Sequence, residues 1–361
     1  MLDFGEEVQL GGGRLEFIRD PDHGLLIRIS GSSSTFRAIY QVAVSHEGRI
    51  LAVVPPGGLR TAPPPPPPMT VWINSDRQGM WGRSCPFCQT YFRTNHIMGA
   101  TFCPYCSRVE DSLRFITEAQ KRYVQAFLNA GLAALRGPDN VTIDLDNITD
   151  ATPEWQYREE QQQFHFRCAD ASCHRETDIL GEYGWCPNCG RSNARQVTEA
   201  ALRANEERFT RTDREVRDRQ LRGAEWELIN NIAFSSFEAL GNHLRTRLVL
   251  FPATPARRQE LINLSFQRLS TSAKTIKQWY DIRIFNGINE SDSAFLNLML
   301  QRRHIVTHNA GRVDEAYLAS SGDTSSRLNQ RIRIRSSEVN RLMPLVRLLC
   351  NNMLDGFESI G

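Results

Sequence analysis

The sequence predicts an α+β protein of several domains, with a β-rich N-terminal segment and zinc ribbons followed by an all-α bundle of four helices. Three observations predict this fold class. Short runs of alternating apolar and polar residues fill the first part of the chain, eight of the nine cysteines fall into two compact sets, and apolar residues recur at helical spacing from Glu225 onward. A length of 361 residues allows two or three domains.

The formal net charge of +2 conceals a division along the chain. Residues 201–361 contain 24 Lys and Arg against 18 Asp and Glu, a net of +6, whereas residues 1–200 contain 19 against 23, a net of −4. A basic excess is compatible with nucleic acid, and a solvated helix face explains it equally well. Since no run approaches the ~18 apolar residues of a membrane span, we expect no membrane partner and a cytoplasmic protein.

Residues 1–62 form the β-rich N-terminal segment. Apolar and polar residues alternate over short runs separated by Gly- and Asp-rich turns, which predicts strands at 14–18, 25–29, 36–44 and 50–54. Residues 63–70 contain six consecutive prolines, and proline cannot donate to a β-ladder. We interpret this segment as a polyproline spacer, with a docking site for a protein partner as the alternative. One more strand is expected at 69–74.

Residues 71–138 are expected to hold the first zinc ribbon and a helix. Two Cys-Pro-x-Cys turns, Cys85–Cys88 and Cys103–Cys106, are separated by fourteen residues. Each turn offers two thiolates to one tetrahedral ion, and we expect the intervening residues to pair as two strands. In a reducing compartment this pattern indicates metal and not disulfides. An amphipathic helix is predicted at 111–135.

Residues 151–197 are expected to form a second zinc ribbon. A strand at 164–167 leads into Cys168 and Cys173, which have four residues between them, and Cys186 and Cys189 form another Cys-Pro-x-Cys turn. Four thiolates are the expected ligands, and either His165 or His174 is the alternative for one of them. Whether these ribbons contact nucleic acid or protein is left open by the sequence.

Residues 198–223 are predicted to be a charged connector helix, because charges occur on nearly every face. Residues 224–361 then show four apolar stripes at helical spacing, separated by Pro, Gly and Asn breaks. Four helices with short joins predict a bundle.

Residues 300–311, LQRRHIVTHNAG, end the third apolar stripe with Arg303-His304-x3-His308. This motif and its position in the bundle resemble the HEPN domain of defence and RNA-processing proteins. The resemblance covers the last third of the chain. It implies a metal-independent endoribonuclease of phage defence or toxin-like growth arrest, an RNA substrate, and a homodimer that builds one cleft from both copies.

The chemistry of these residues is consistent with that resemblance. RNA carries its own nucleophile, so cleavage needs a base for the 2′-hydroxyl, an acid for the leaving oxygen, and positive charge at phosphorus. Histidine can move the protons, and arginine can bind two phosphate oxygens. We therefore expect Arg303 and His308 to be catalytic, with His304 assisting. On a regular helix Arg303 and His308 lie ~140° apart, so either the helix distorts near Thr307 or a second copy completes the site.

Five further residues are weaker candidates for substrate binding: Arg302, Asn309, Arg331, Arg333 and Arg335. The last three alternate along the chain and would share one face of an extended segment. Asn242 and His243 are polar residues of the first helical stripe, while Cys350 lies among apolar residues and is expected to be a core thiol. The alternative function is a non-catalytic adaptor that binds nucleic acid through the ribbons and dimerises through the helices.

Overall fold

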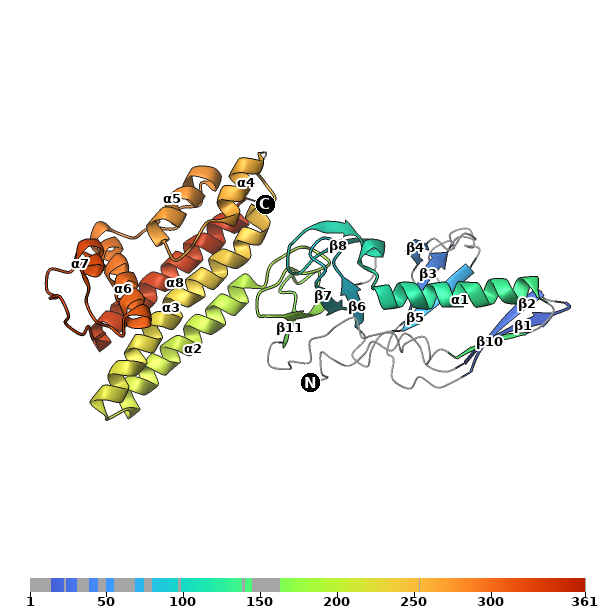
Figure 1. Ribbon diagram of the computed structural model, residues 1–361, viewed down its shortest axis with the longest axis horizontal. Coiled ribbons are helices and arrows are strands. Elements are labelled where there is room, and N and C mark those ends of the chain that lie inside the picture. The colour runs from blue at the N-terminus through green and yellow to red at the C-terminus, as the bar shows by residue number, and fades with distance from the viewer. Residues whose placement is uncertain are drawn as a thin grey trace. The chain divides into compact units, whose positions relative to one another are not determined.

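The computed structural model describes residues 14–22, 24–30, 39–44, 50–54, 69–74, 80–96, 99–137, 140–144, 163–252 and 254–360. The chain divides into an N-terminal unit, Met1–Asn193, and a C-terminal unit, Ala194–Gly361. The first contains small sheets, whereas the named elements in the described part of the second are all helices (Figure 1). Among the described residues, no helix combines the length and the apolar character that crossing a membrane requires.

The predicted N-terminal strands are present. Strands β1 (Arg14–Asp20), β2 (Gly24–Ser30) and β10 (Val141–Asp144) form one antiparallel sheet in the order β10-β1-β2. A second antiparallel sheet has the order β4-β3-β5 and contains β3 (Ile39–Val44), β4 (Ile50–Val54) and β5 (Met69–Asn74). The six prolines at 63–68, on which the spacer prediction rests, lie outside the described residues.

The helix predicted at 111–135 is divided in two. A short 3₁₀ turn, η1 (Ser112–Phe115), ends at Ile116, whose backbone is extended, and α1 (Glu118–Arg136) follows. The Thr117 hydroxyl accepts a hydrogen bond from the Gln120 amide, and the Gln120 side chain accepts one from the Thr117 amide, which forms a capping box. Local capping therefore overrides the continuous apolar period.

The strands of the first ribbon do not pair as predicted. Strand β7 (Tyr91–Thr94) pairs with β6 (Trp81–Ser84) across the first cysteine turn, and β8 (Ala100–Phe102) pairs with β9 (Val109–Asp111) across the second. The two strands of the insert, β7 and β8, therefore do not pair with each other. Each pairs with the strand on the other side of the adjacent cysteine turn.

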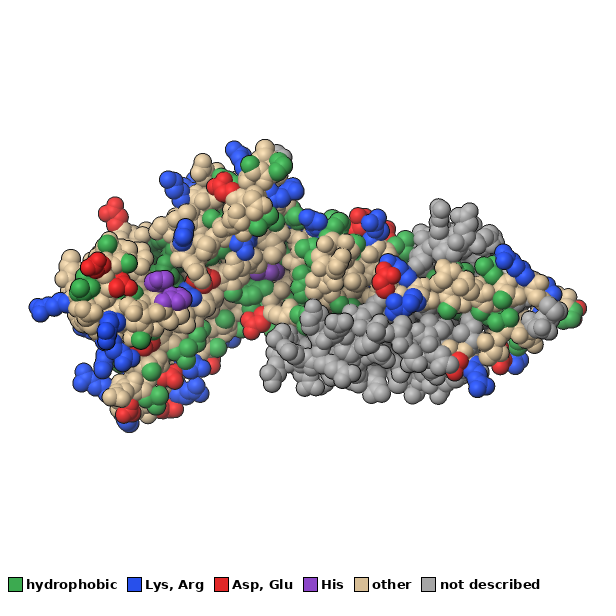
Figure 2. Space-filling model, viewed as in Figure 1, with side chains coloured by type: hydrophobic (Ala, Val, Ile, Leu, Met, Phe, Trp, Pro, Cys, Tyr) green, Lys and Arg blue, Asp and Glu red, His purple; other side chains and the backbone are tan. Residues whose placement is uncertain are grey.

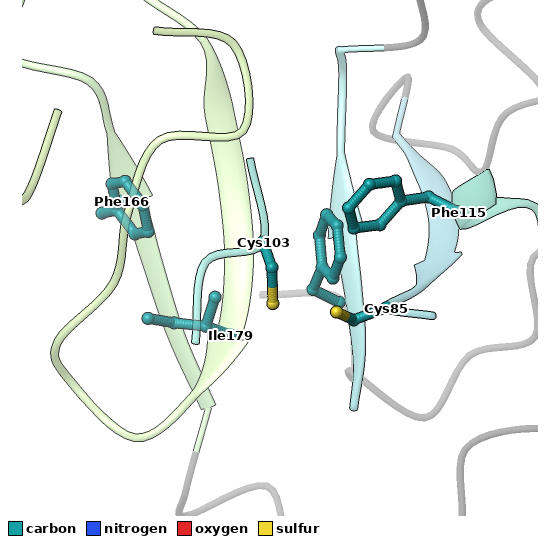
Figure 3. Close-up of a cluster of buried hydrophobic side chains, with 6 residues drawn as sticks. Cys85, Cys103, Phe115, Phe166 and Ile179 are labelled. Carbon is teal, nitrogen blue, oxygen red and sulfur yellow. The ribbon is translucent and has the colours of Figure 1, made fainter. Parts of the chain in front are cut away.

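The two ribbons share one sheet and one core. Strands β11 (Gln163–Arg167) and β12 (Glu176–Leu180) form the hairpin of the second ribbon, and β12 also pairs with β7 to give the order β11-β12-β7-β6. Figure 3 shows Phe166 and Ile179 on one side of this core, with Phe115 and Cys85 on the other. The ribbons are thus one structural unit.

The C-terminal unit contains seven helices among its described residues. They are α2 (Ala194–Glu215), α3 (Arg219–Leu248), α4 (Pro255–Ile262), α5 (Leu269–Tyr280), α6 (Glu290–His308), α7 (Glu315–Ser321) and α8 (Ser336–Glu358). Helices α2, α3 and α8 pack side by side (Figure 1). The second predicted stripe is divided between α4 and α5.

The expected connector at 198–223 is instead part of this bundle. Most of it belongs to α2, which buries Val197 and Leu202 against its neighbours, and its end already belongs to α3. A narrow apolar stripe among many charges is sufficient for packing because the long charged side chains remain at the solvent side. Cys350 is fully buried, as predicted, and burial raises the pKa of its thiol to about 12.

Candidate functional site

All four cysteine turns of the ribbons close with the same hydrogen bond and the same left-handed residue. In each, the amide of the first cysteine donates a hydrogen bond to the carbonyl of the second residue after the second cysteine, at 2.8–3.1 Å. The residue directly after the second cysteine is left-handed in every turn; these residues are Gln89, Ser107, His174 and Gly190. The longer Cys168–Cys173 turn therefore closes in the same way as the three Cys-Pro-x-Cys turns.

The cysteine sulfurs form two compact tetrads. In the first, Cys85 and Cys106 are 3.7 Å apart and Cys88 and Cys103 are 3.6 Å apart. The corresponding distances in the second are 3.5 Å for Cys168–Cys189 and 3.6 Å for Cys173–Cys186. Disulfide sulfurs would lie about 2.05 Å apart, whereas four sulfurs about 2.3 Å from one tetrahedral ion lie ~3.8 Å apart.

Both tetrads can therefore bind a metal ion such as zinc, since the sulfur atoms of each set lie within 4.8 Å of one another. The close thiols also perturb one another: the hydrogen bond with Cys103 lowers the pKa of Cys85 to about 7. Neither His165 nor His174 belongs to the second tetrad, which the four cysteines complete by themselves. This agrees with the expectation of all-thiolate ligands.

The ribbons are related by an approximate two-fold arrangement. The amide of Phe102 donates to the Pro187 carbonyl at 2.8 Å, and the amide of Trp185 donates to the Pro104 carbonyl at 3.0 Å. Each donor is the residue directly before Cys103 or Cys186, and each acceptor is the proline directly after the equivalent cysteine of the other ribbon. Where β7 meets β12, Arg93 and Asp178 lie opposite each other and form a buried ion pair at 2.6 Å.

The motif of residues 300–311 covers the C-terminal part of α6 and the start of the loop that follows it. Asn309 ends the helix, and its side chain donates to the Arg312 carbonyl at 2.8 Å, so this candidate residue shapes the following loop. Ile305 faces inward and packs on Val313, Tyr317 and Ile332. The helix continues through Thr307 without a break, which excludes the local distortion that would have aimed Arg303 and His308 at one point.

Arg302 lies inside the bundle. Its guanidinium donates to Glu338 at 2.5 Å, to Asp323 at 3.3 Å and to the Tyr317 hydroxyl at 3.4 Å. Burial lowers the pKa of Arg302, but the hydrogen bond with Tyr317 and the charge of Glu338 outweigh it and hold the pKa above its usual range. Arg302 thus ties α6 to α8 and to the loop after α7, in contrast to the expected position on an RNA-binding surface.

Arg303, one residue further, points toward α3. It forms an ion pair with Glu238 through both terminal nitrogens, and its Nε donates to Asn231 at 2.8 Å. A terminal nitrogen also donates to Ser235 at 3.2 Å. The side chains of Arg303 and Glu238 are only 15% and 13% exposed, so this pair is largely shielded from water.

His304 and His308 lie one helical turn apart and are both exposed. Their ring centroids are 4.8 Å apart, with the rings tilted by 50°. Figure 2 shows a pair of adjacent histidine side chains at the surface of the helical unit. The structure brings these two imidazoles together, while the side chain of Arg303 is held at α3.

The three alternating arginines occupy one exposed face, as predicted. Arg331, Arg333 and Arg335 are exposed, while Ile332 and Ile334 between them are buried. The segment begins beside the end of α6, because the Ile332 amide donates to the Gly311 carbonyl at 2.8 Å. It ends at the N-terminus of α8.

Asn242 and His243 differ in exposure. Asn242 is exposed, whereas His243 is only 7% exposed, and burial lowers the pKa of its imidazole to about 3. His243 is therefore a neutral core residue at neutral pH.

The chain matches no family model, no curated protein and no solved structure. The residues that sequence reasoning missed are those that hold Arg303, above all Glu238. Glu238 lies on the polar side of a helical stripe, and no local pattern indicates which distant cation it will meet.

Proposed function

We propose that the C-terminal unit is a metal-independent endoribonuclease of the HEPN type, in phage defence or toxin-like growth arrest. The observation that carries this proposal is the pair of exposed imidazoles, His304 and His308, 4.8 Å apart beside a row of exposed arginines. Two adjacent histidines provide a base and an acid near neutral pH. The arginines provide the charge that a phosphate backbone requires.

In the proposed reaction one imidazole takes the proton of a ribose 2′-hydroxyl. The 2′-oxygen forms a bond to phosphorus, the bond from phosphorus to the 5′-oxygen breaks, and a second imidazole protonates the leaving oxygen. The products are a 2′,3′-cyclic phosphate and a 5′-hydroxyl. We assign the main proton transfer to His308, assistance to His304, and stabilisation of phosphate charge to Arg303.

The ion pair of Arg303 shapes this proposal. Glu238 neutralises the guanidinium in the free protein, so a substrate phosphate has to displace the carboxylate before Arg303 can bind it. Since Arg303 and His308 also diverge around α6, we propose that they meet at one phosphate across a homodimer, with each copy giving one of them.

The reaction is tested with purified full-length protein and single-stranded RNA in a brief excess of EDTA, and the metal content of the same sample is measured afterwards by mass spectrometry. We expect cleavage with a 2′,3′-cyclic phosphate end, no cleavage of a 2′-O-methyl strand, and a loss of at least 100-fold, on the order of one general acid–base group, in His308→Ala. Equal cleavage by His308→Ala, or loss of wild-type cleavage while the cysteine-bound metal is retained, contradicts the proposal.

Dimer geometry is tested by mixing two inactive variants, Arg303→Ala and His308→Ala. If each phosphate is contacted by residues of both copies, half of the dimers are mixed and each contains one intact site, so about a quarter of wild-type activity returns. A mixture as inactive as its components, or an active monomer by light scattering, contradicts the shared site.

For the ribbons we propose two structural zinc ions, one in each cysteine tetrad, and a role in recognising nucleic acid or a protein partner. The sulfur distances support zinc, since a tetrahedral site of four thiolates is typical of structural zinc. Two zinc ions per chain by mass spectrometry are the expected result.

One observation favours a second function. Because Arg303 is already paired with Glu238, the helical unit is also compatible with a non-catalytic role in which it dimerises and the ribbons bind nucleic acid. Salt-dependent binding of RNA without any cleavage would identify the protein as such an adaptor.

A further inference from the structure

A basic cavity of the C-terminal unit is formed by other residues than the histidine pair. It is a cavity of about 970 Å³ between the α2–α3 turn and the start of α8. Four arginines and one carboxylate line it; they are Arg217, Arg219, Arg222, Arg335 and Asp213. The lining therefore has a net charge of about +3, which favours an anion.

The arginines of this cavity are differently engaged. Arg222 donates through Nε to the Val216 carbonyl at 2.8 Å, so its stem is fixed across the α2–α3 turn. Arg217, Arg219 and Arg335 are exposed at the cavity. A guanidinium can bind two phosphate oxygens at once, so one fixed and three adjustable cations are suited to a phosphodiester.

The start of α8 and Trp226 of α3 also line the cavity, and the Ser336 hydroxyl donates to Asp213 at 3.2 Å. Ser336 and Ser337, the first residues of α8, line the cavity, and amides at a helix N-terminus favour negative charge. Trp226 lines it as well, and its buried indole Nε1 has no hydrogen-bond partner in the described part of the chain. The indole ring at the cavity is a surface on which a base can stack.

The row of exposed arginines connects this cavity to the end of α6. Arg331 pairs with Arg312 in an isolated β-bridge directly after the histidine helix, and Arg335 lines the cavity. Alternate residues of an extended segment are about 6.6 Å apart, a separation comparable to that of successive phosphates in an extended strand. A strand lying on Arg331, Arg333 and Arg335 would therefore reach from one site to the other.

We infer that the cavity is a phosphate-binding subsite for single-stranded RNA, which extends along Arg331–Arg335 toward His304 and His308. This inference rests on the proposed function, because it takes the strand that reaches the histidines as the substrate. The subsite anchors the substrate by its backbone and leaves the cleaved bond at α6.

Binding is measured without cleavage by fluorescence anisotropy, using full-length protein and a labelled strand of 2′-O-methyl RNA at several salt concentrations. The test variant is Arg217→Ala/Arg219→Ala, the charge-retaining variant is Arg217→Lys/Arg219→Lys, and Arg258→Ala removes an exposed arginine of α4 as the control. We expect the slope of log affinity against log salt to fall by about 1.4 in the test variant, since each single-strand phosphate contact contributes about 0.7. The other two variants should keep the wild-type slope.

Equal slopes in the test variant and the Arg258→Ala control overturn the inference. AMP provides a second arm, because a free nucleotide offers the same phosphate chemistry. Binding of AMP to the wild type but not to the test variant, with the labelled strand neither displaced by AMP nor changed in its salt slope by the variant, assigns the cavity to a free nucleotide and overturns the strand subsite. Failure of the nuclease proposal is distinguishable, since RNA would then stay intact while the cavity variant still lowered the slope.

Discussion

Replacing either partner of the Arg303–Glu238 pair separates a tethering role from a catalytic one. In Arg303→Met the carboxylate of Glu238 is left largely buried without its cation, which costs about 3 kcal/mol of unfolding free energy. In Glu238→Gln the amide oxygen still accepts a hydrogen bond from Arg303, so the cost is about 1–2 kcal/mol.

These losses are measurable by thermal unfolding. For a unit of this size, 1 kcal/mol shifts Tm by about 2–4 °C, so we expect decreases of about 6–12 °C for Arg303→Met and about 2–8 °C for Glu238→Gln. The double variant should lose less than the sum of the two, because it removes both charges together.

Cleavage should respond in the opposite sense at the two positions. Removing Arg303 takes away a cation that stabilises transition-state charge, and we expect kcat/KM to fall by about 100-fold to 1,000-fold. Removing the charge of Glu238 leaves Arg303 free to bind phosphate, so Glu238→Gln should keep or increase kcat/KM. If Glu238→Gln loses as much activity as Arg303→Met at a temperature where both are folded, Arg303 acts only as a tether between α6 and α3.

Three further predictions concern the framework around the site. Arg302→Met leaves Asp323 and Glu338 without their shared cation and should lower the free energy of unfolding in urea by about 3–5 kcal/mol. The triple variant Arg302→Met/Asp323→Asn/Glu338→Gln should recover part of that loss. Equal stability of the two variants would contradict a buried ion-pair network. Cys186→Ser should lower the bound metal from two ions per chain toward none, because both ribbons share one core and one sheet. If the variant keeps one ion in a cooperatively folded ribbon, the two ribbons fold independently. His243 should make unfolding pH-dependent, because its pKa of about 3 in the folded state lies below the ordinary 6.5. Its contribution to stability is therefore fully present above pH 6.5 and is lost as the pH falls from 6.5 toward 3. At pH 5.5 the loss should be about 1.4 kcal/mol. That pH-dependent part should be absent from His243→Leu in urea titrations at pH 7 and 5.5.

Cysteine spacing predicted the most definite chemistry because a short turn fixes its own geometry. Two cysteines of a Cys-Pro-x-Cys turn can bind one ion wherever the turn occurs, and the longer Cys168–Cys173 turn closes with the same hydrogen bond and left-handed residue. What spacing could not predict is the pairing of β7 with β12, since strand register depends on partners that are distant along the chain. The merging of two ribbons into one sheet is such a long-range property.

The helical unit shows the same limit at single residues. Periodicity places Arg302 and Arg303 about 100° apart on one helix, but it does not indicate which of two identical side chains faces the core. The decision comes from Asp323 and Glu338 on one side and from Glu238 on the other, residues 21 to 65 positions away in sequence. Likewise, the many charged residues of α2 gave no indication that its narrow apolar stripe packs against α3 and α8.

The neutralised arginine is also the strongest constraint on how a nuclease of this kind would be restrained. An unpaired Arg303 would bind any phosphate that reached it, whereas the pair with Glu238 requires a competing anion with enough affinity to displace a shielded carboxylate. A strand anchored at the cavity between the α2–α3 turn and the start of α8 raises the local concentration of phosphate at α6 without changing the Arg303–Glu238 pair. The strand is therefore anchored first and displaces Glu238 from Arg303 second. An RNA too short to span Arg331–Arg335 should bind α6 more weakly than a longer RNA that contains the same sequence.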